Sequence, residues 1–271
     1  MWLALSISGS ALSPAWLKQL LISLRGAGGS QGRTSWSAKP ELADYVSFYG
    51  FMMLYMNCLR LEVGSRSDRE TDEGVRLVLG GYSYGSMVAS HLPGSEVVAH
   101  LFQDVKRGSP AHEIFLTAKR VWALSSGETP NSTGPTSSKN LAAYQSAQDL
   151  LLTSKTMISY LLVSPLLPPV NLFLTLFLDM TLEVDTQASG QRTQVPCPRP
   201  PDQLCAHRSL AIYGDEDTFT SVSKLRKWSG ELSKASLSQF RSTEVEGAGH
   251  FWREDGVEQE ARQALRRWLH Q

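Results

Sequence analysis

Residues 78–87 read Val-Leu-Gly-Gly-Tyr-Ser-Tyr-Gly-Ser-Met and decide the fold of this chain. The apolar run Val75–Leu79 leads into a G-x-S-x-G motif centred on Ser83, and a stretch compatible with a helix, Ser86–His91, follows. This order predicts a strand that turns sharply into a helix and exposes one serine at the edge of a sheet. Glycine is needed two residues before and after the serine, because Cβ atoms there would collide. The plainer alternative is a glycine-rich turn in which Ser83 only caps the helix.

The C-terminal third of the chain repeats the pattern of a strand followed by a polar loop. A short apolar strand is predicted at 210–213, and it runs into the acidic loop Gly214–Phe219. A second strand is predicted at 242–246, and it runs into Gly247-Ala-Gly-His-Phe, which presents His250. Open parallel sheets place ligands and catalytic groups beyond the carboxyl ends of their strands. Helices are predicted at 41–61, 221–232 and 257–269.

Three carboxyl groups in the acidic loop compete for the role of the acid that orients a histidine: Asp215, Glu216 and Asp217. Asp217 is favoured over Asp215, because Asp215 is better placed to hydrogen-bond the turn itself. Among six histidines, only His250 follows a predicted strand within a glycine loop. The other five show no H-x-x-x-H or H-E-x-x-H spacing, so no metal site is predicted. They are His91, His100, His112, His207 and His270.

With these motifs the chain resembles the α/β-hydrolase superfamily of serine-hydrolase type, in particular a fungal branch of uncharacterised α/β hydrolases. The resemblance covers most of residues 20–271 and is strongest at R-G-x-G-x-S (25–30), G-Y-S-Y-G, G-D-x-D and G-A-G-H-F. It implies an α/β fold with a mostly parallel central sheet and helices on both faces. By the same resemblance Ser83 is the nucleophile, Asp217 the triad acid and His250 the general base.

The resemblance implies a serine hydrolase, like an esterase, that cleaves a small ester, thioester or related acyl substrate through an acyl-enzyme. The backbone N–H of Tyr84, the residue after the nucleophile, is expected to stabilise the oxyanion. No cofactor is required. Two alternatives stay open: a non-catalytic protein of the same fold, and a membrane-associated lipid hydrolase. The identity of the substrate does not follow from the fold.

The N-terminus is shorter than the resembled family has it, and residues 1–19 are atypical. One explanation makes Trp2–Ser8 a shortened form of the strand that carries the other oxyanion donor, with Gly9 or Ser10 offering the second N–H. The other explanation is a truncated chain with a gap in the sheet, where backbone groups lose their partners. Residues 2–12 also resemble the apolar part of a signal peptide, although no basic residue precedes them.

The length of 271 residues fits one domain, residues 1–271, with a cap or flexible insertion expected within 111–155. The most hydrophobic run is Ile158–Met180, and prolines interrupt it. We expect a buried parallel strand at 158–163, a proline turn and an apolar helix near 172–177. Membrane contact through this run is the less favoured alternative.

Composition excludes some partners and favours one compartment. Lysine plus arginine and aspartate plus glutamate both number 26, so the net charge is zero and nothing indicates nucleic-acid binding. Three cysteines in a chain of this length favour reduced thiols and a cytoplasmic location over secretion. Cys197 and Cys205 flank a proline-rich turn and could pair in an oxidising compartment. The expected partner is a small acyl substrate, and the oligomeric state does not follow from the sequence.

Overall fold

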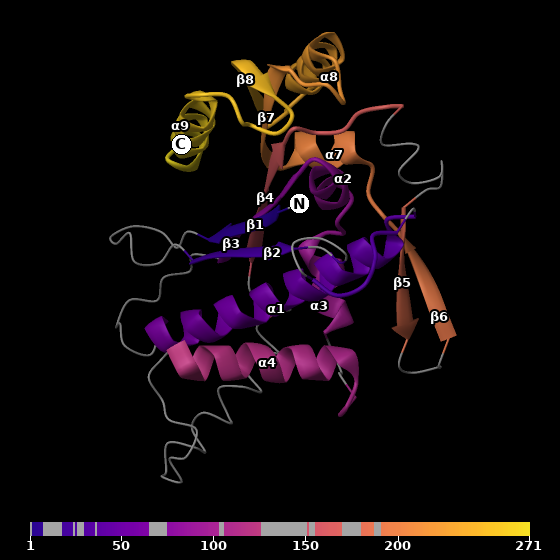
Figure 1. The fold of residues 1–271 in the computed structure, drawn as a ribbon. Helices are drawn as coiled ribbons and strands as arrows, with labels where there is room; N and C mark the ends of the chain where they lie inside the picture. Colours follow the sequence, from indigo (N-terminus) through magenta and orange to yellow (C-terminus); the bar gives the residue numbers. More distant parts are fainter. Residues whose placement is uncertain are drawn as a thin grey trace.

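The computed structural model of the protein describes residues 2–7, 18–23, 25, 30–35, 37–64, 75–102, 106–125, 151, 155–169, 180–186 and 191–271. Its centre is a six-stranded sheet in the order β2-β1-β3-β4-β7-β8 (Figure 1). Four neighbouring strands are parallel, so the protein is an α/β protein with a mostly parallel central sheet. They are β3 (Val75–Tyr82), β4 (Thr156–Val163), β7 (Arg208–Glu216) and β8 (Phe240–Gly249).

Both faces of β3 and β4 are covered, and their sequences are accordingly mostly apolar. In β3, Leu77 and Leu79 belong to the larger core cluster, whereas Val78 between them belongs to the smaller one. Successive side chains of a strand point to opposite faces, so a strand buried on both sides reads as one continuous apolar run. This is why Val75–Leu79 and the predicted strand at 158–163 show no polar alternation.

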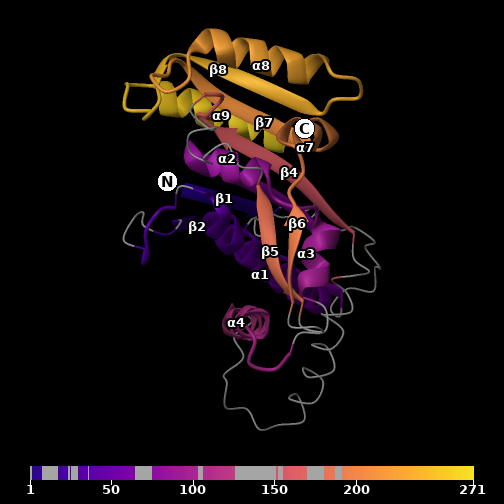
Figure 2. The same cartoon turned by 90° about the vertical axis from the view of Figure 1, so that its right-hand side faces the viewer.

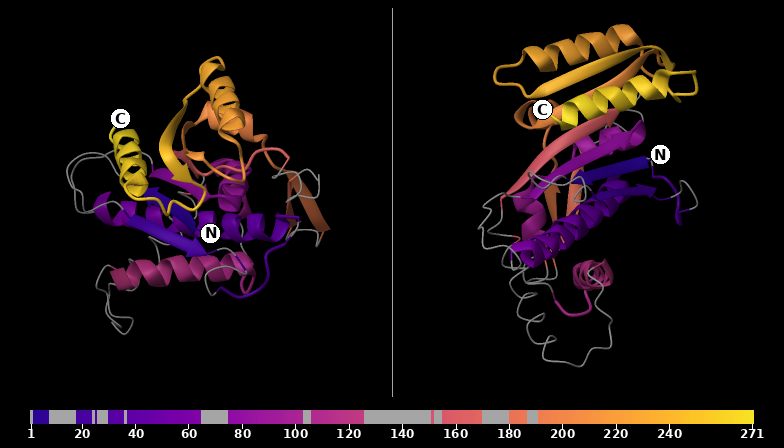
Figure 3. Two further views of the ribbon diagram at one scale, coloured as in Figure 1. Left: turned by 45° about the horizontal axis from the view of Figure 1, so that its top comes forward. Right: turned by 90° about the vertical axis from the view of Figure 1, so that its left-hand side faces the viewer.

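Helices cover both faces of the sheet (Figures 2 and 3). The smaller cluster joins one face to α9 (Val257–Leu269) through Val257, Ala264 and Trp268. The larger cluster joins the other face to the remaining long and short helices. These are α1 (Lys39–Gly64), α2 (Tyr84–Ser90), α3 (Ser95–Leu101), α4 (Pro110–Ser125), α7 (Pro200–Ala206) and α8 (Val222–Lys234).

The helices predicted at 41–61, 221–232 and 257–269 are confirmed as α1, α8 and α9. The strands predicted at 158–163, 210–213 and 242–246 are confirmed and extend further, as β4, β7 and β8. The apolar helix predicted near 172–177 lies outside the described residues. A hairpin of β5 (Thr181–Thr186) and β6 (Gln191–Pro196) was not predicted; it forms a separate two-stranded sheet.

The N-terminal strand lies within the sheet, next to β3, but it runs antiparallel to β3. β1 (Trp2–Ile7) lies between β2 (Lys18–Ser23) and β3, and it pairs antiparallel with both. Of the two explanations considered, the one with a central gap in the sheet is therefore wrong, because β1 fills that position. In this register Leu5 lies opposite Leu79 and Ser6 opposite Val78, so the carboxyl end of β1 points toward the beginning of β3 and away from Ser83. Gly9 and Ser10 themselves lie outside the described residues.

The first part of the expected cap, residues 111–125, is α4, which packs on α1 (Figure 1). Most of the remaining range to 155 lies outside the described residues, so a cap stays a prediction. Cys197 and Cys205 are free thiols, as is Cys58, so the pairing considered for the first two does not occur. Within the described part of the chain, every helix is too short or too polar to cross a membrane.

Candidate active site

Ser83 lies on a strained turn between β3 and α2. Its backbone angles are φ 54° and ψ −121°, a conformation that a residue with a Cβ adopts only where the surrounding structure enforces it. A Cβ on Gly81 would lie 2.2 Å from the carbonyl carbon of Gly85, so the strand and the helix are in backbone contact. The backbone N–H of Ser83 donates to the carbonyl oxygen of Val163 at 2.8 Å, which fixes the turn to β4. The predicted strand–turn–helix is thus confirmed.

The three residues predicted to act together are joined by two hydrogen bonds. Nε2 of His250 lies 2.8 Å from Oγ of Ser83, and Nδ1 of His250 lies 2.7 Å from Oδ2 of Asp217. The side chains of His250 and Asp217 are only 3% and 1% exposed, so water competes little for the bond between them. Three groups from the carboxyl ends of β3, β7 and β8 therefore meet at one edge of the sheet.

The surroundings of Asp217 keep its carboxyl group ionised. Burial alone would raise its pKa, but hydrogen bonds from His250 and from the backbone of Thr220 and Phe219 outweigh that cost and lower the pKa. The two N–H groups donate to Oδ1 at 3.0 Å and 2.8 Å. An ionised carboxylate only accepts hydrogen bonds, so Nδ1 of His250 must carry its hydrogen. Nε2 is then free to accept the proton of the Ser83 hydroxyl.

The structure distinguishes the two aspartates, of which the sequence favours Asp217. Asp217 binds His250, whereas Oδ1 of Asp215 accepts a hydrogen bond at 2.7 Å from the backbone N–H of Gly247, in β8. We expected Asp215 to bond within its own turn; instead it ties that turn to the neighbouring strand. Glu216, the third candidate, is exposed.

Two residues that the sequence analysis did not single out hold the backbone of His250. The hydroxyl of Tyr82, directly before the serine, donates to the carbonyl oxygen of His250 at 2.8 Å. Burial, and then the charge of Asp217, raises the pKa of Tyr82, which keeps its hydroxyl protonated as a donor. The hydroxyl of Ser164, which follows β4, donates to the same oxygen at 3.4 Å and accepts from Nε1 of Trp252 at 2.9 Å. Their position after predicted strands was the available signal.

Aromatic rings surround the imidazole of His250. The centre of the Phe219 ring lies 4.4 Å from that of the imidazole, and the rings of Phe251 and Tyr82 lie at 5.3 Å and 5.5 Å. Phe219 and Phe251 also meet each other edge to face, with 6.0 Å between ring centres. Both follow a proposed triad residue closely in sequence, but nothing in the sequence distinguishes them from core residues.

Of the two predicted oxyanion donors, Tyr84 and Gly9, the structure describes only Tyr84. Tyr84 is the first residue of α2, and the first N–H groups of a helix have no partner within the helix, as the prediction requires. Gly9 lies outside the described residues. Gly9 was expected beside Ser83 because it follows β1. Since β1 runs antiparallel to β3, its carboxyl end lies near the beginning of β3, far from Ser83, and this reason no longer holds.

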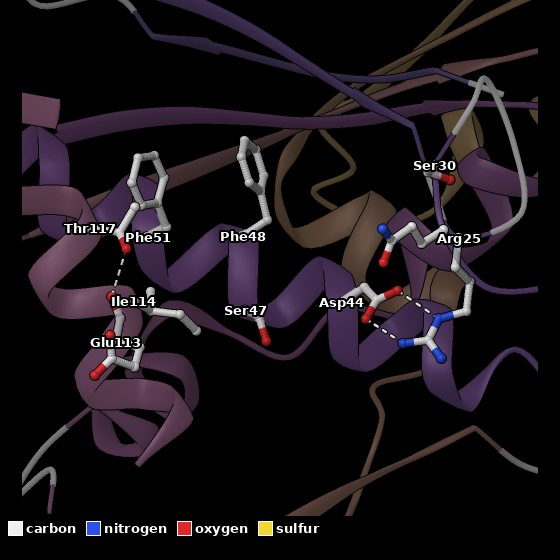
Figure 4. A pocket seen from close by; sticks show the side chains of 10 residues that line it. Arg25, Ser30, Asp44, Ser47, Phe48, Phe51, Glu113, Ile114 and Thr117 are labelled. Carbon is white, nitrogen blue, oxygen red and sulfur yellow. Dashed lines mark hydrogen bonds and ion pairs between the residues drawn. The ribbon is translucent and has the colours of Figure 1, made fainter. Parts of the chain in front are cut away.

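A pocket of about 520 Å³ lies elsewhere, between α1 and α4 (Figure 4). Phe48, Phe51 and Ile114 give it apolar walls, and the ion pair of Arg25 and Asp44, with 2.7 Å between Nε and Oδ2, lies at one end. Ser83, Asp217 and His250 do not line it. The guanidinium of Arg25 is engaged by the carboxylate of Asp44.

Among the described residues no group of histidine, cysteine and acidic side chains could hold a metal ion. Comparison with protein-family models, with curated proteins and with solved structures gives no match for this chain. The candidate site therefore stands on its own geometry.

Proposed function

We propose that this protein is a serine hydrolase of the α/β-hydrolase fold, which cleaves a small ester, thioester or related acyl substrate. One observation carries the proposal: the unbroken series of hydrogen bonds from Asp217 through His250 to Ser83, with the serine on a strained turn. A serine that only capped α2 would bond its own helix. Here Ser83 makes no side-chain hydrogen bond to the helix, and its Oγ faces the histidine instead.

The proposed reaction follows from the assigned protons. Oγ of Ser83 attacks the acyl carbonyl while Nε2 of His250 takes the hydroxyl proton, and Asp217 stabilises the imidazolium that forms. The negative charge on the carbonyl oxygen falls near the N–H of Tyr84. The imidazolium then gives its proton to the leaving group, and water hydrolyses the acyl-enzyme by the same steps. In each stage the imidazole becomes positively charged, and Asp217 stabilises that charge because its carboxyl group stays ionised.

A fluorophosphonate probe tests this function, because it phosphonylates only an activated serine. We expect the purified protein to be labelled, Ser83→Ala to be unlabelled, and Ser236→Ala to be labelled like the wild type. Ser236 is an exposed serine of the same chain and serves as the matched control. Thermal unfolding of all three proteins shows whether each is folded. A folded wild type that takes up no label contradicts the proposal.

The direction of β1 favours a second candidate, a binding protein of the same fold without turnover. If no donor replaces the one expected from this strand, the oxyanion is held by Tyr84 alone, and one missing donor typically costs about 10²- to 10³-fold in rate. Turnover of a simple ester separates the candidates. A protein that is labelled at Ser83 but hydrolyses no ester above the rate of Ser83→Ala is the binding protein.

A further inference from the structure

Two of the large apolar side chains most exposed in the described structure lie at the candidate site. Phe219 is 47% exposed and Phe251 is 57% exposed, although both rings contact the buried imidazole of His250. Single exposed apolar residues are common and need no explanation. Two rings that touch each other and the same catalytic imidazole form a continuous apolar surface, and such a surface indicates binding.

The backbone that builds the triad also fixes these rings. The N–H of Phe219 donates to Oδ1 of Asp217 at 2.8 Å, and Phe251 directly follows His250. The guanidinium of Arg253 lies over the Phe251 ring, 5.3 Å from its centre, which helps to orient the ring. The aromatic surface therefore has a defined position relative to Nε2 of His250, and both rings are partly exposed to solvent.

The chemistry of the triad assigns a substrate group to this surface. During acylation the C–O bond of the ester breaks, the bond from Oγ of Ser83 to the acyl carbon forms, and Nε2 of His250 gives its proton to the departing oxygen. The departing oxygen must lie within hydrogen-bond distance of Nε2 at that moment. The group attached to it then lies beside the rings around the imidazole, whereas the acyl group lies toward Tyr84.

We propose that Phe219 and Phe251 form the leaving-group subsite of this enzyme and select substrates whose leaving group is aromatic. The proposal rests on the proposed function, because only a proton-donating His250 defines a leaving-group side. Aromatic rings prefer edge-to-face or offset contacts with other rings, and a ring that enters beside Phe219 and Phe251 can make both. An aliphatic leaving group of similar size gains only the burial of its apolar surface.

The test compares two esters with the same acyl group, phenyl acetate and hexafluoroisopropyl acetate, whose leaving groups have similar acidity. The variants are Phe219→Leu and Phe251→Leu, which keep apolar bulk but remove the ring. We expect each to lower kcat/KM for phenyl acetate by about three- to tenfold, the size of one aromatic contact, and to change the value for the other ester by less than about twofold. Phe219→Tyr and Phe251→Tyr keep the ring and should restore the preference.

Fluorophosphonate labelling distinguishes recognition from a structural role of the rings. The probe expels fluoride, so its reaction depends on the activation of Ser83 but not on an aromatic leaving group. We expect both leucine variants to lose less in labelling rate than in kcat/KM for phenyl acetate. Leu237→Ala, a control at a residue that is 94% exposed, should be labelled at the wild-type rate. An equal loss for both esters and for labelling shows that the rings only support His250 and overturns the proposal. Unchanged kinetics for both esters overturn it as well, and an unlabelled wild type rejects the hydrolase function itself.

Discussion

The contact between strand and helix at the elbow gives the sharpest test of the site, through the substitution Gly81→Ala. The added Cβ would lie 2.2 Å from the carbonyl carbon and oxygen of Gly85, whereas ordinary contacts begin at 3.4 Å, so the two backbones must separate by about 1.2 Å. Inserting a carbon into a tightly packed region costs about 1–3 kcal/mol of stability. The atoms that must move here are backbone atoms, which places the expected loss at the upper end of that range.

The same displacement should impair the chemistry. Oγ of Ser83 lies 2.8 Å from Nε2 of His250, and a shift of about 1 Å takes this pair beyond hydrogen-bond reach. A misplacement of that size typically costs about 10²-fold in rate. We therefore expect Gly81→Ala to be folded at low temperature, to unfold at lower urea concentration, and to react with a fluorophosphonate about 10²-fold more slowly.

Gly230→Ala is the matched control, because the same carbon is added within α8 where nothing lies within 4 Å. Replacing glycine by alanine inside a helix should stabilise the protein by about 0.5–1 kcal/mol and leave labelling unchanged. Urea unfolding gives the free energies and a labelling time course gives the rates. If Gly81→Ala matched the wild type in both, the argument from the elbow would be refuted.

Three further predictions concern charge and burial. Asp217→Asn should lower ester hydrolysis on the order of 10⁴-fold, as kinetics will show. Asp215→Ala leaves the backbone N–H of Gly247 without its acceptor and should mainly cost about 1–3 kcal/mol of stability, as urea unfolding will show. The pKa of the Asp217 carboxyl group is lower in the folded chain than in the unfolded chain, where it is about 3.9. The ionised group therefore contributes its full stabilisation of the folded state above about pH 3.9, and this contribution is lost as the pH falls through the folded-state pKa. The difference in unfolding free energy between wild type and Asp217→Asn should decrease over that acidic range. Burial raises the pKa of Cys58 to about 11, so this thiol should react with a disulfide reagent at neutral pH only after unfolding.

The parts of the site that could be predicted are those encoded by adjacent residues. The glycines around Ser83 and the loop before His250 carry their conformation locally, and the predicted strand at 242–246 fixed the edge of the sheet at which His250 lies. The preference for Asp217 over Asp215 agrees with the hydrogen bond to His250, although Asp215 bonds the neighbouring strand and not its own turn. The structure adds the distances and the buried environment.

The rest depends on contacts between distant segments. The residues of Trp2–Ile7 do not predict that this strand pairs antiparallel with β3. The direction of a strand within a sheet depends on its partner strand and on the connection between the two. Polar and apolar residues alternate in Thr181–Thr186, which is the pattern of a half-buried strand, so β5 could have been predicted. The exposure of Phe219 and Phe251 could not be predicted from the sequence, because aromatic residues beside a strand are most often buried.

The bond from Tyr82 to His250 has a consequence for the order in which the protein is made. It joins residues 168 positions apart, one directly before the serine and the other in the last loop before α9. During synthesis the elbow leaves the ribosome long before His250, which directly follows β8, an edge strand of the sheet. Under the proposed function, the Ser83 hydroxyl of a nascent chain therefore stays without its general base until His250 has been synthesised and packed beside it.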